Sequence, residues 1–158
     1  MLDKRKFYIN GKWIEPSKKN DFEVINPSNE ETFAIISLGS KADVDLAVKV
    51  SKNAFESWKE TTKEERIKLL ENLLSIYKKR FSEMTEAISK EMGAPMDWSS
   101  NVQNASGQVH LEDFIERLKN FKFDEQFDSK SNNQIFYEPI GVCGLITPWN
   151  WPINQIAL

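Results

Sequence analysis

Hydrophobic and polar positions alternate over short stretches at the start of the chain, which is the pattern of β-strands. Two apolar runs, Phe7-Tyr8-Ile9 and Trp13-Ile14, flank Asn10-Gly11. This dipeptide best tolerates the positive φ angles of a two-residue hairpin turn, so a β-hairpin is predicted here. Two further strands are predicted at residues 22–25 and 32–36. The first forty residues are therefore expected to be rich in β-structure.

Apolar residues change to helical spacing after residue 40. Ser40 with Asp43, and Thr62 with Glu65, each combine a hydroxyl residue with an acidic residue three positions later. This pattern is the capping box that begins a helix. The residues predicted to form one apolar face are Val44, Ala47, Val48, Phe55 and Trp58 in the first helix, and Ile67, Leu70, Leu74, Tyr77 and Phe81 in the second.

Two more helices are predicted before residue 121. The third begins near Ser82 and ends at Gly93, because glycine commonly follows a helix end and Pro95 blocks continuation. The fourth covers roughly 96–120. Its candidate core residues are Trp98, Val102, Ala105, Val109 and Leu118.

A second hairpin is predicted at residues 121–137. Phe121, Phe123 and Phe127 alternate with charged residues, a polar turn follows, and Gln134-Ile135-Phe136-Tyr137 resumes as a strand. Such an arm is either an ordinary surface hairpin or an oligomerisation element, because exposed strand edges invite pairing.

The last strong pattern is a short apolar run at residues 142–146, bounded by glycine and proline. A strand buried on both faces of a parallel sheet has this pattern, and ligands bind at the carboxyl ends of such strands. Pro148 and Pro152 restrict the backbone around Asn150, which suits a side-chain amide pre-aimed at an oxyanion. From these residues alone, a packed loop remains the favoured interpretation of this turn.

Composition narrows the function classes. The 158 residues are 40% hydrophobic and 28% charged with a net charge of −3, which is typical of a globular protein and argues against a nucleic-acid partner. No apolar run is long enough for a membrane span, and the first residues lack the apolar stretch of a signal peptide. The single cysteine, Cys143, allows no intramolecular disulfide. A cytoplasmic location is the default expectation.

Five segments, taken in order, resemble one known family. They are Tyr8-Ile9-Asn10-Gly11-Lys12-Trp13, Val24-Ile25-Asn26-Pro27-Ser28, Leu38-Gly39-Ser40 with the helix start at 43–48, Glu91-Met92-Gly93-Ala94-Pro95, and Pro139-Ile140-Gly141-Val142-Cys143-Gly144 through Pro148-Trp149-Asn150-Trp151-Pro152. In these segments the chain is similar to the N-terminal part of an aldehyde dehydrogenase of the NAD(P)-dependent superfamily. The matches run in family order across nearly the whole chain, so chance similarity is improbable.

The resemblance implies an α/β fold that is the N-terminal part of a Rossmann-type cofactor-binding domain. Its parts would be an N-terminal β-hairpin, a helical bundle, a hairpin arm and the first core parallel strand. Residues 1–120 would hold the hairpins and helices of this domain, 121–139 the oligomerisation arm, and 140–158 the first core strand and its turn.

The resemblance also implies site residues and partners. The complete enzyme would oxidise a small aldehyde with NAD or NADP and form a homodimer or homotetramer, with no nucleic-acid or membrane partner. The implied roles are an oxyanion-hole amide at Asn150, a dinucleotide site lined by Ile146, Thr147, Pro148 and Trp149, and a monovalent-cation site formed by the carbonyls of Val24 and Ile25 with the carboxylate of Glu91.

The family's remaining catalytic groups, a nucleophilic cysteine and a general-base glutamate, lie beyond Leu158. The family's cofactor-binding lysine and its later glycine-containing motif lie there too, so this chain is expected not to catalyse by itself. Cys143 is interpreted as an inert buried core residue, and His110 as a partly exposed helix residue. The alternative function is a non-catalytic packing or partner-binding module derived from the same family.

Overall fold

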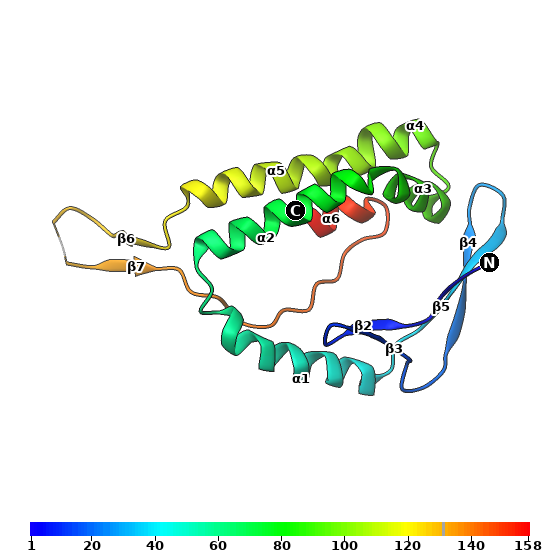
Figure 1. Cartoon of the computed structure of the whole chain (residues 1–158), viewed down its shortest axis with the longest axis horizontal. Helices are drawn as coiled ribbons and strands as arrows, with labels where there is room; N and C mark the ends of the chain where they lie inside the picture. Colours follow the sequence, from blue (N-terminus) through cyan, green and yellow to red (C-terminus); the bar gives the residue numbers. More distant parts are fainter. Residues whose placement is uncertain (131) are drawn as a thin grey trace.

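The computed structural model describes residues 1–130 and 132–158, which form small sheets and a set of helices (Figure 1). One sheet has the order β1-β5-β4, built from β1 (Leu2–Lys4), β5 (Glu31–Ser37) and β4 (Asp21–Asn26). β4 and β5 correspond to the two predicted strands and pair in antiparallel fashion, whereas β1 runs parallel to β5. Sequence reasoning missed β1, because three residues that include an aspartate and a lysine carry no strand pattern.

The first predicted hairpin is confirmed. β2 (Phe7–Ile9) and β3 (Lys12–Ile14) pair in antiparallel register. Asn10 and Gly11 between them have φ angles of 55° and 72°, the positive values that a two-residue primed turn requires.

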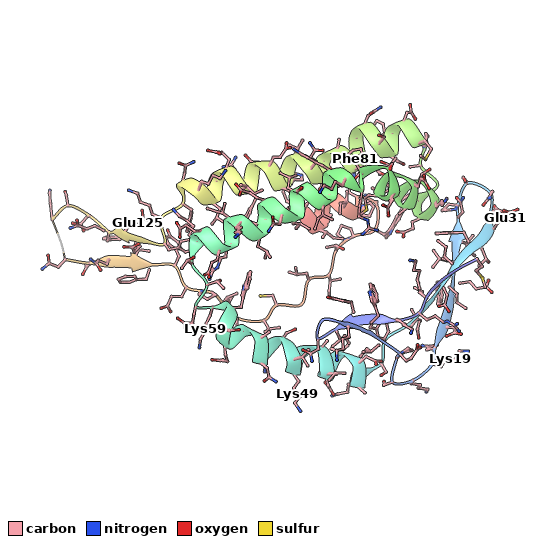
Figure 2. All side chains as sticks on the ribbon, viewed as in Figure 1. Lys19, Glu31, Lys49, Lys59, Phe81 and Glu125 are labelled. Carbon is pink, nitrogen blue, oxygen red and sulfur yellow. The ribbon has the colours of Figure 1, made fainter. Side chains whose placement is uncertain are left out.

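The first helix, α1 (Lys41–Trp58), begins where its capping box predicts but does not bury its apolar face. The backbone N–H of Ser40 donates to the Asp43 carboxylate at 2.8 Å. Val44 and Trp58, both predicted to lie on one apolar face, remain 57% and 47% exposed, so that face is not buried. The reason is position: α1 lies across the molecule from α5 in Figure 1, and Lys49 projects outward from it in Figure 2.

The remaining helices pack against one another and hold most of the core. α2 (Lys63–Lys79) lies along α5 (Ala105–Asn120), and α3 (Phe81–Met92) lies against the π-helical segment η1 (Ser99–Asn104), which links the short α4 (Met96–Trp98) to α5. A last short helix, α6 (Pro152–Ala157), docks on α5 (Figure 1). The buried apolar side chains are Ala34, Tyr77, Ile88, Leu111 and Ile115.

A buried polar cluster joins α2, α3 and η1. The Tyr77 hydroxyl hydrogen-bonds to two oxygens of Asn104, the backbone carbonyl oxygen, at 2.8 Å, and the side-chain amide oxygen. The Asn104 amide donates to the carbonyl of Phe81 at 2.7 Å and to the Thr85 hydroxyl at 2.8 Å. Burial raises the pKa of Tyr77 to about 12, so its hydroxyl keeps its proton and can donate at neutral pH.

This cluster overturns part of the predicted core of the fourth helix. Trp98 and Val109 are 49% and 58% exposed, whereas the polar residues Ser99, Gln103 and Asn104 are buried. A π-helical turn has more residues than an α-helical one. The extra residue therefore changes which positions of the helix face the core. Asn104 is turned inward, and its hydrogen bonds satisfy its buried polar atoms.

The second hairpin is confirmed as an element, since β6 (Asp124–Gln126) and β7 (Gln134–Phe136) pair in antiparallel register. It projects beyond the end of α5 (Figure 1), and residue 131 in its predicted polar turn lies outside the described residues.

The core strand expected at 142–146 is not formed. Residues 138–148 have no regular structure and no described strand pairs with them, so Leu145 is 86% and Ile146 100% exposed. The physical reason is the lack of sheet neighbours among the described residues, because a strand needs partners for its backbone groups. Of the helices described, none combines the length and the hydropathy needed to cross a membrane.

Candidate functional site

The predicted oxyanion residue, Asn150, lies in a turn between the irregular segment and α6. Pro152 occupies the first turn of α6, where its missing N–H and fixed φ are tolerated. The carbonyl oxygen of Asn150 accepts a hydrogen bond from the side-chain amide of Gln103 at 3.3 Å. The turn is thus attached to η1, 47 residues earlier in the chain.

Helix α6 is held against α5 by close packing and one polar contact. A Cβ at Gly107 would lie 2.9 Å from a side-chain carbon of Ile153 and 2.7 Å from the Tyr77 hydroxyl. Only glycine therefore lets α6 approach this closely. The side-chain amide nitrogen of Asn154 lies 2.8 Å from Nε2 of His110. The two side chains are therefore hydrogen-bonded, and the tautomer of His110 decides which of them donates.

These contacts involve residues that sequence reasoning did not select. His110 was expected to be partly exposed, and it is, but its contact with Asn154 was not foreseen. Gly107 within a predicted helix was the available signal, because an interior helical glycine that is not at a helix end often marks close packing.

The four predicted cofactor residues form one open edge beside Asn150. All of them are exposed, with Ile146 at 100% and Trp149 at 79%. None of the four lines either the cavity beside the β1-β5-β4 sheet or the cavity at the base of the hairpin arm. The described residues therefore do not enclose these four side chains.

The structure brings two of the three predicted cation residues to one place. Val24 and Glu91 both line a cavity of about 580 Å³ between the β1-β5-β4 sheet and helices α2 and α3. The strand register shifts by one residue between Val24 and Ile25, where β5 carries an extra residue. Such a bulge disrupts the ladder locally, and carbonyl oxygens and a carboxylate are ligands that hard cations prefer.

Glu91 has the electrostatic character that a bound cation would use. Glu91 is exposed at the surface, but desolvation of its carboxyl by nearby protein atoms raises its pKa above the ordinary value, so a positive charge beside it would be stabilising. No described group of three or more histidine, cysteine or acidic residues could hold a metal ion by side chains alone. Any site here therefore depends on backbone oxygens.

Cys143 differs from its predicted role. It was expected to be a buried core residue, but it is exposed on the irregular segment. Its thiol contacts the carbonyl oxygen of Gly141 at 3.8 Å. A carbonyl cannot take a proton to activate the thiol, so this contact does not make Cys143 a nucleophile.

A second cavity, of about 520 Å³, lies where the hairpin arm meets α1 and α2. The guanidinium of Arg66 stands 5.9 Å from the Trp58 ring and 5.8 Å from the Phe123 ring. Phe121 packs edge-on against Tyr137 at the same place. The base of the arm is thereby fixed to the helices, although sequence reasoning had not singled out Arg66.

Comparison with known proteins gives a consistent result. The model of the aldehyde dehydrogenase family matches residues 13–158. The chain is 42% identical to the 3-succinoylsemialdehyde-pyridine dehydrogenase of Pseudomonas sp, over 99% of this chain and 32% of that protein. It is 39% identical to a putative aldehyde dehydrogenase of Staphylococcus aureus, over 100% and 33% of the two chains. The chain thus spans about a third of the length of these curated relatives.

Solved structures give the same picture. An aldehyde dehydrogenase from Bartonella henselae superposes with a TM-score of 0.97 at 50% identity, over 99% of this chain and 33% of that one. Aldehyde dehydrogenase C of Pseudomonas syringae, a mutant solved with NAD+ and octanal, gives 0.92 at 37% identity, over 97% and 31%. The α/β fold expected for this chain is therefore confirmed.

Proposed function

This chain belongs to the aldehyde dehydrogenase family, and on that premise we propose that it supplies the oxyanion donor and one wall of the cofactor site of an NAD(P)-dependent aldehyde dehydrogenase. The observation that carries the proposal is the match of 97% of the chain to an enzyme solved with NAD+ and octanal. The site is completed by residues outside this chain.

The chemistry assigns one role to Asn150. In the complete enzyme a cysteine thiolate outside these 158 residues adds to the aldehyde carbonyl, and the carbonyl oxygen becomes an oxyanion. The side-chain amide of Asn150 donates a hydrogen bond to that oxyanion and so stabilises the thiohemiacetal. A bound NAD or NADP supplies the hydride acceptor. Hydrolysis of the resulting thioester then releases the carboxylic acid.

The residues 146–149 suit a wall of the cofactor site. Ile146 and Trp149 present large apolar surfaces that nothing in the described chain covers, and such surfaces favour contact with the flat rings of a dinucleotide. Their position beside Asn150 would place the cofactor next to the reacting carbonyl. These residues form only one side of the site. This agrees with the chain spanning about a third of the length of its relatives.

Two further roles and a cellular location form part of the proposal. The carbonyls of Val24 and Ile25 with the Glu91 carboxylate bind a monovalent cation, a role supported by the cavity that Val24 and Glu91 share. The arm at 121–139 joins subunits of a homodimer or homotetramer. This role is supported by its rigid base and by the exposed Phe127 and Phe136, each 64% exposed. The enzyme acts in the cytoplasm.

The test joins residues 1–158 to the remaining two thirds of a relative and measures aldehyde-dependent reduction of NAD+ and NADP+. Asn150→Ala should lower kcat by about 10²–10³-fold, the usual effect of losing one oxyanion donor, with cofactor affinity nearly unchanged. Asn101→Ala, at an exposed position in η1, is the matched control and should leave kcat unchanged.

Two outcomes would contradict the proposal. An unchanged kcat with weakened cofactor binding in Asn150→Ala would make Asn150 a cofactor or packing residue. A joined enzyme that folds but oxidises no aldehyde would favour the non-catalytic module. The 158-residue chain alone is expected to be inactive, and dinucleotide reduction abolished by Cys143→Ala would refute that expectation.

A further inference from the structure

Gln103 is a buried polar residue whose side chain reaches the candidate site. It is 3% exposed, and its side-chain N–H donates to the carbonyl of Asn150 at 3.3 Å. Its side-chain oxygen is buried with no hydrogen-bond partner among the described residues. A buried acceptor without a donor destabilises the fold. A methionine would fill a similar volume without that cost. The N–H donor of the amide, which bonds to Asn150, therefore accounts for a glutamine at this buried position.

Gln103 is itself held in place by the residues that follow it in the helix. The next residue, Asn104, is tied to α2 and α3 by the buried polar cluster. The Ser106 hydroxyl donates to the carbonyl oxygen of Gln103 at 2.7 Å. Gln103 lies in a π-helical segment, a rare geometry that occurs frequently at functional sites. The amide of Gln103 is therefore presented to the turn from a rigid support.

The turn needs such a support at Asn150. Pro148 and Pro152 fix their own φ angles and restrict the residues before them. Trp149 and Asn150 are the two residues of the turn that the prolines leave free to rotate. A hydrogen bond to the carbonyl of Asn150 fixes the peptide plane after it, and the direction of the Asn150 side chain follows from that backbone.

We propose that Gln103 is a positioning residue that orients the Asn150 amide toward the oxyanion through its hydrogen bond to the Asn150 carbonyl. The inference rests on the proposed oxyanion role of Asn150. Gln103 touches neither substrate nor cofactor in this role. Its contribution is to hold the donor in one direction before the reaction begins.

The decisive experiment is a double-mutant cycle in the joined enzyme, with Gln103→Met and Asn150→Ala. Gln103→Met should lower kcat by about tenfold to a hundredfold, the range that a small misplacement of a reacting group causes. The KM values for aldehyde and NAD+ should stay nearly constant. In the Asn150→Ala background, Gln103→Met should have little further effect, because residues that act through one another are not additive.

The control is Gln108→Met, which removes the same amide from the same helical stretch. Gln108 bonds to Glu112 at 3.0 Å rather than to the turn, so kcat should not change. A second readout uses the 158-residue chain: Gln103→Met should speed amide hydrogen exchange at residues 150–155 by about tenfold and leave α2 unchanged. If Gln103→Met fails to fold, Gln103→Leu, which also lacks the amide N–H and adds no charge, replaces it in both measurements.

The outcomes separate this inference from the function on which it rests. If Asn150→Ala lowers kcat and the Gln103 variants do not, the positioning role is refuted and the oxyanion role stands. If the Gln103 effect is equally large with and without Asn150, Gln103 acts by another route and the inference is also refuted. If Asn150→Ala leaves kcat unchanged, the proposed function itself fails.

Discussion

Gly93 at the end of α3 lies directly on the backbone of Ser28 in the turn between β4 and β5. Gly93 has a φ of +69°, and a Cβ there would stand 3.0 Å from the amide nitrogen of Ser28 and 3.1 Å from a side-chain carbon of Pro27. Two segments on which the family resemblance rests, 24–28 and 91–95, thus meet in space.

Replacing Gly93 by alanine should destabilise the chain. The left-handed conformation costs a residue with a Cβ about 1–2 kcal/mol, and the contacts with Ser28 and Pro27 add strain. Urea unfolding measures the loss. Gly144→Ala is the matched control, because a Cβ there meets no atom within 4 Å and should change the free energy of unfolding by less than about 0.5 kcal/mol. Equal effects of the two substitutions would contradict this account.

Sodium or potassium chloride should raise the melting temperature more than N-methylglucamine chloride of equal ionic strength, if Val24, Ile25 and Glu91 bind a monovalent cation. At a cation concentration ten times Kd the stabilisation is about 1.4 kcal/mol, or roughly 3–6 °C for a chain of this size. Glu91→Gln should abolish the difference. Glu86→Gln, which removes a carboxylate from the same cavity, should preserve it. An identical cation response in Glu91→Gln and the unsubstituted chain would exclude this site.

The elements that were predicted well are those whose signals are local. The positive φ angles of Asn10-Gly11 and the capping boxes at Ser40 and Thr62 depend only on residues up to three positions away. Gly93 ends its helix for the same kind of reason. Such features form in the chain as they would in a longer protein.

The features that were missed depend on residues far away in sequence. Gln103 and Asn104 look like surface residues of a helix, and only their partners at Asn150, Phe81 and Thr85 make them interior ones. The strand at 142–146 fails for the opposite reason. Its apolar pattern indicates burial between sheet neighbours, and the described residues provide none.

Stability between pH 4 and pH 2 should depend on Asp43. Hydrogen bonds from the backbone N–H groups of Ser17 and Ser40 and from the Ser40 hydroxyl lower the pKa of Asp43 to about 2 from its ordinary value of 3.8. A carboxyl whose pKa is lower in the folded state stabilises it above the unfolded value, and the contribution disappears as pH falls through the folded one. The ionised Asp43 therefore contributes fully above about pH 4.

The urea concentration at the midpoint of unfolding, measured from pH 6 to pH 2, tests this dependence on Asp43. The midpoint of the unsubstituted chain should fall more steeply below pH 4 than that of Asp43→Asn, which has no carboxyl to protonate. Asp97→Asn removes an exposed carboxylate in α4 and should keep the steep fall. Parallel curves for Asp43→Asn and the unsubstituted chain would show that the contacts of Asp43 with Ser17 and Ser40 do not hold the start of α1.

Amide hydrogen exchange in the 158-residue chain should be fast across residues 142–146 and slow in α2 and α5. The segment has no paired strand among the described residues and exposes Leu145 and Ile146 almost completely, whereas α2 and α5 bury Tyr77, Leu111 and Ile115 between them. Fast exchange follows from backbone groups that are open to water. In the enzyme joined to the remaining two thirds of a relative, the same residues should become protected, because neighbouring strands would then bury them. Strong protection of 142–146 in a monomer of the 158-residue chain would mean that this chain buries the segment unaided, and the argument for missing sheet neighbours would be wrong.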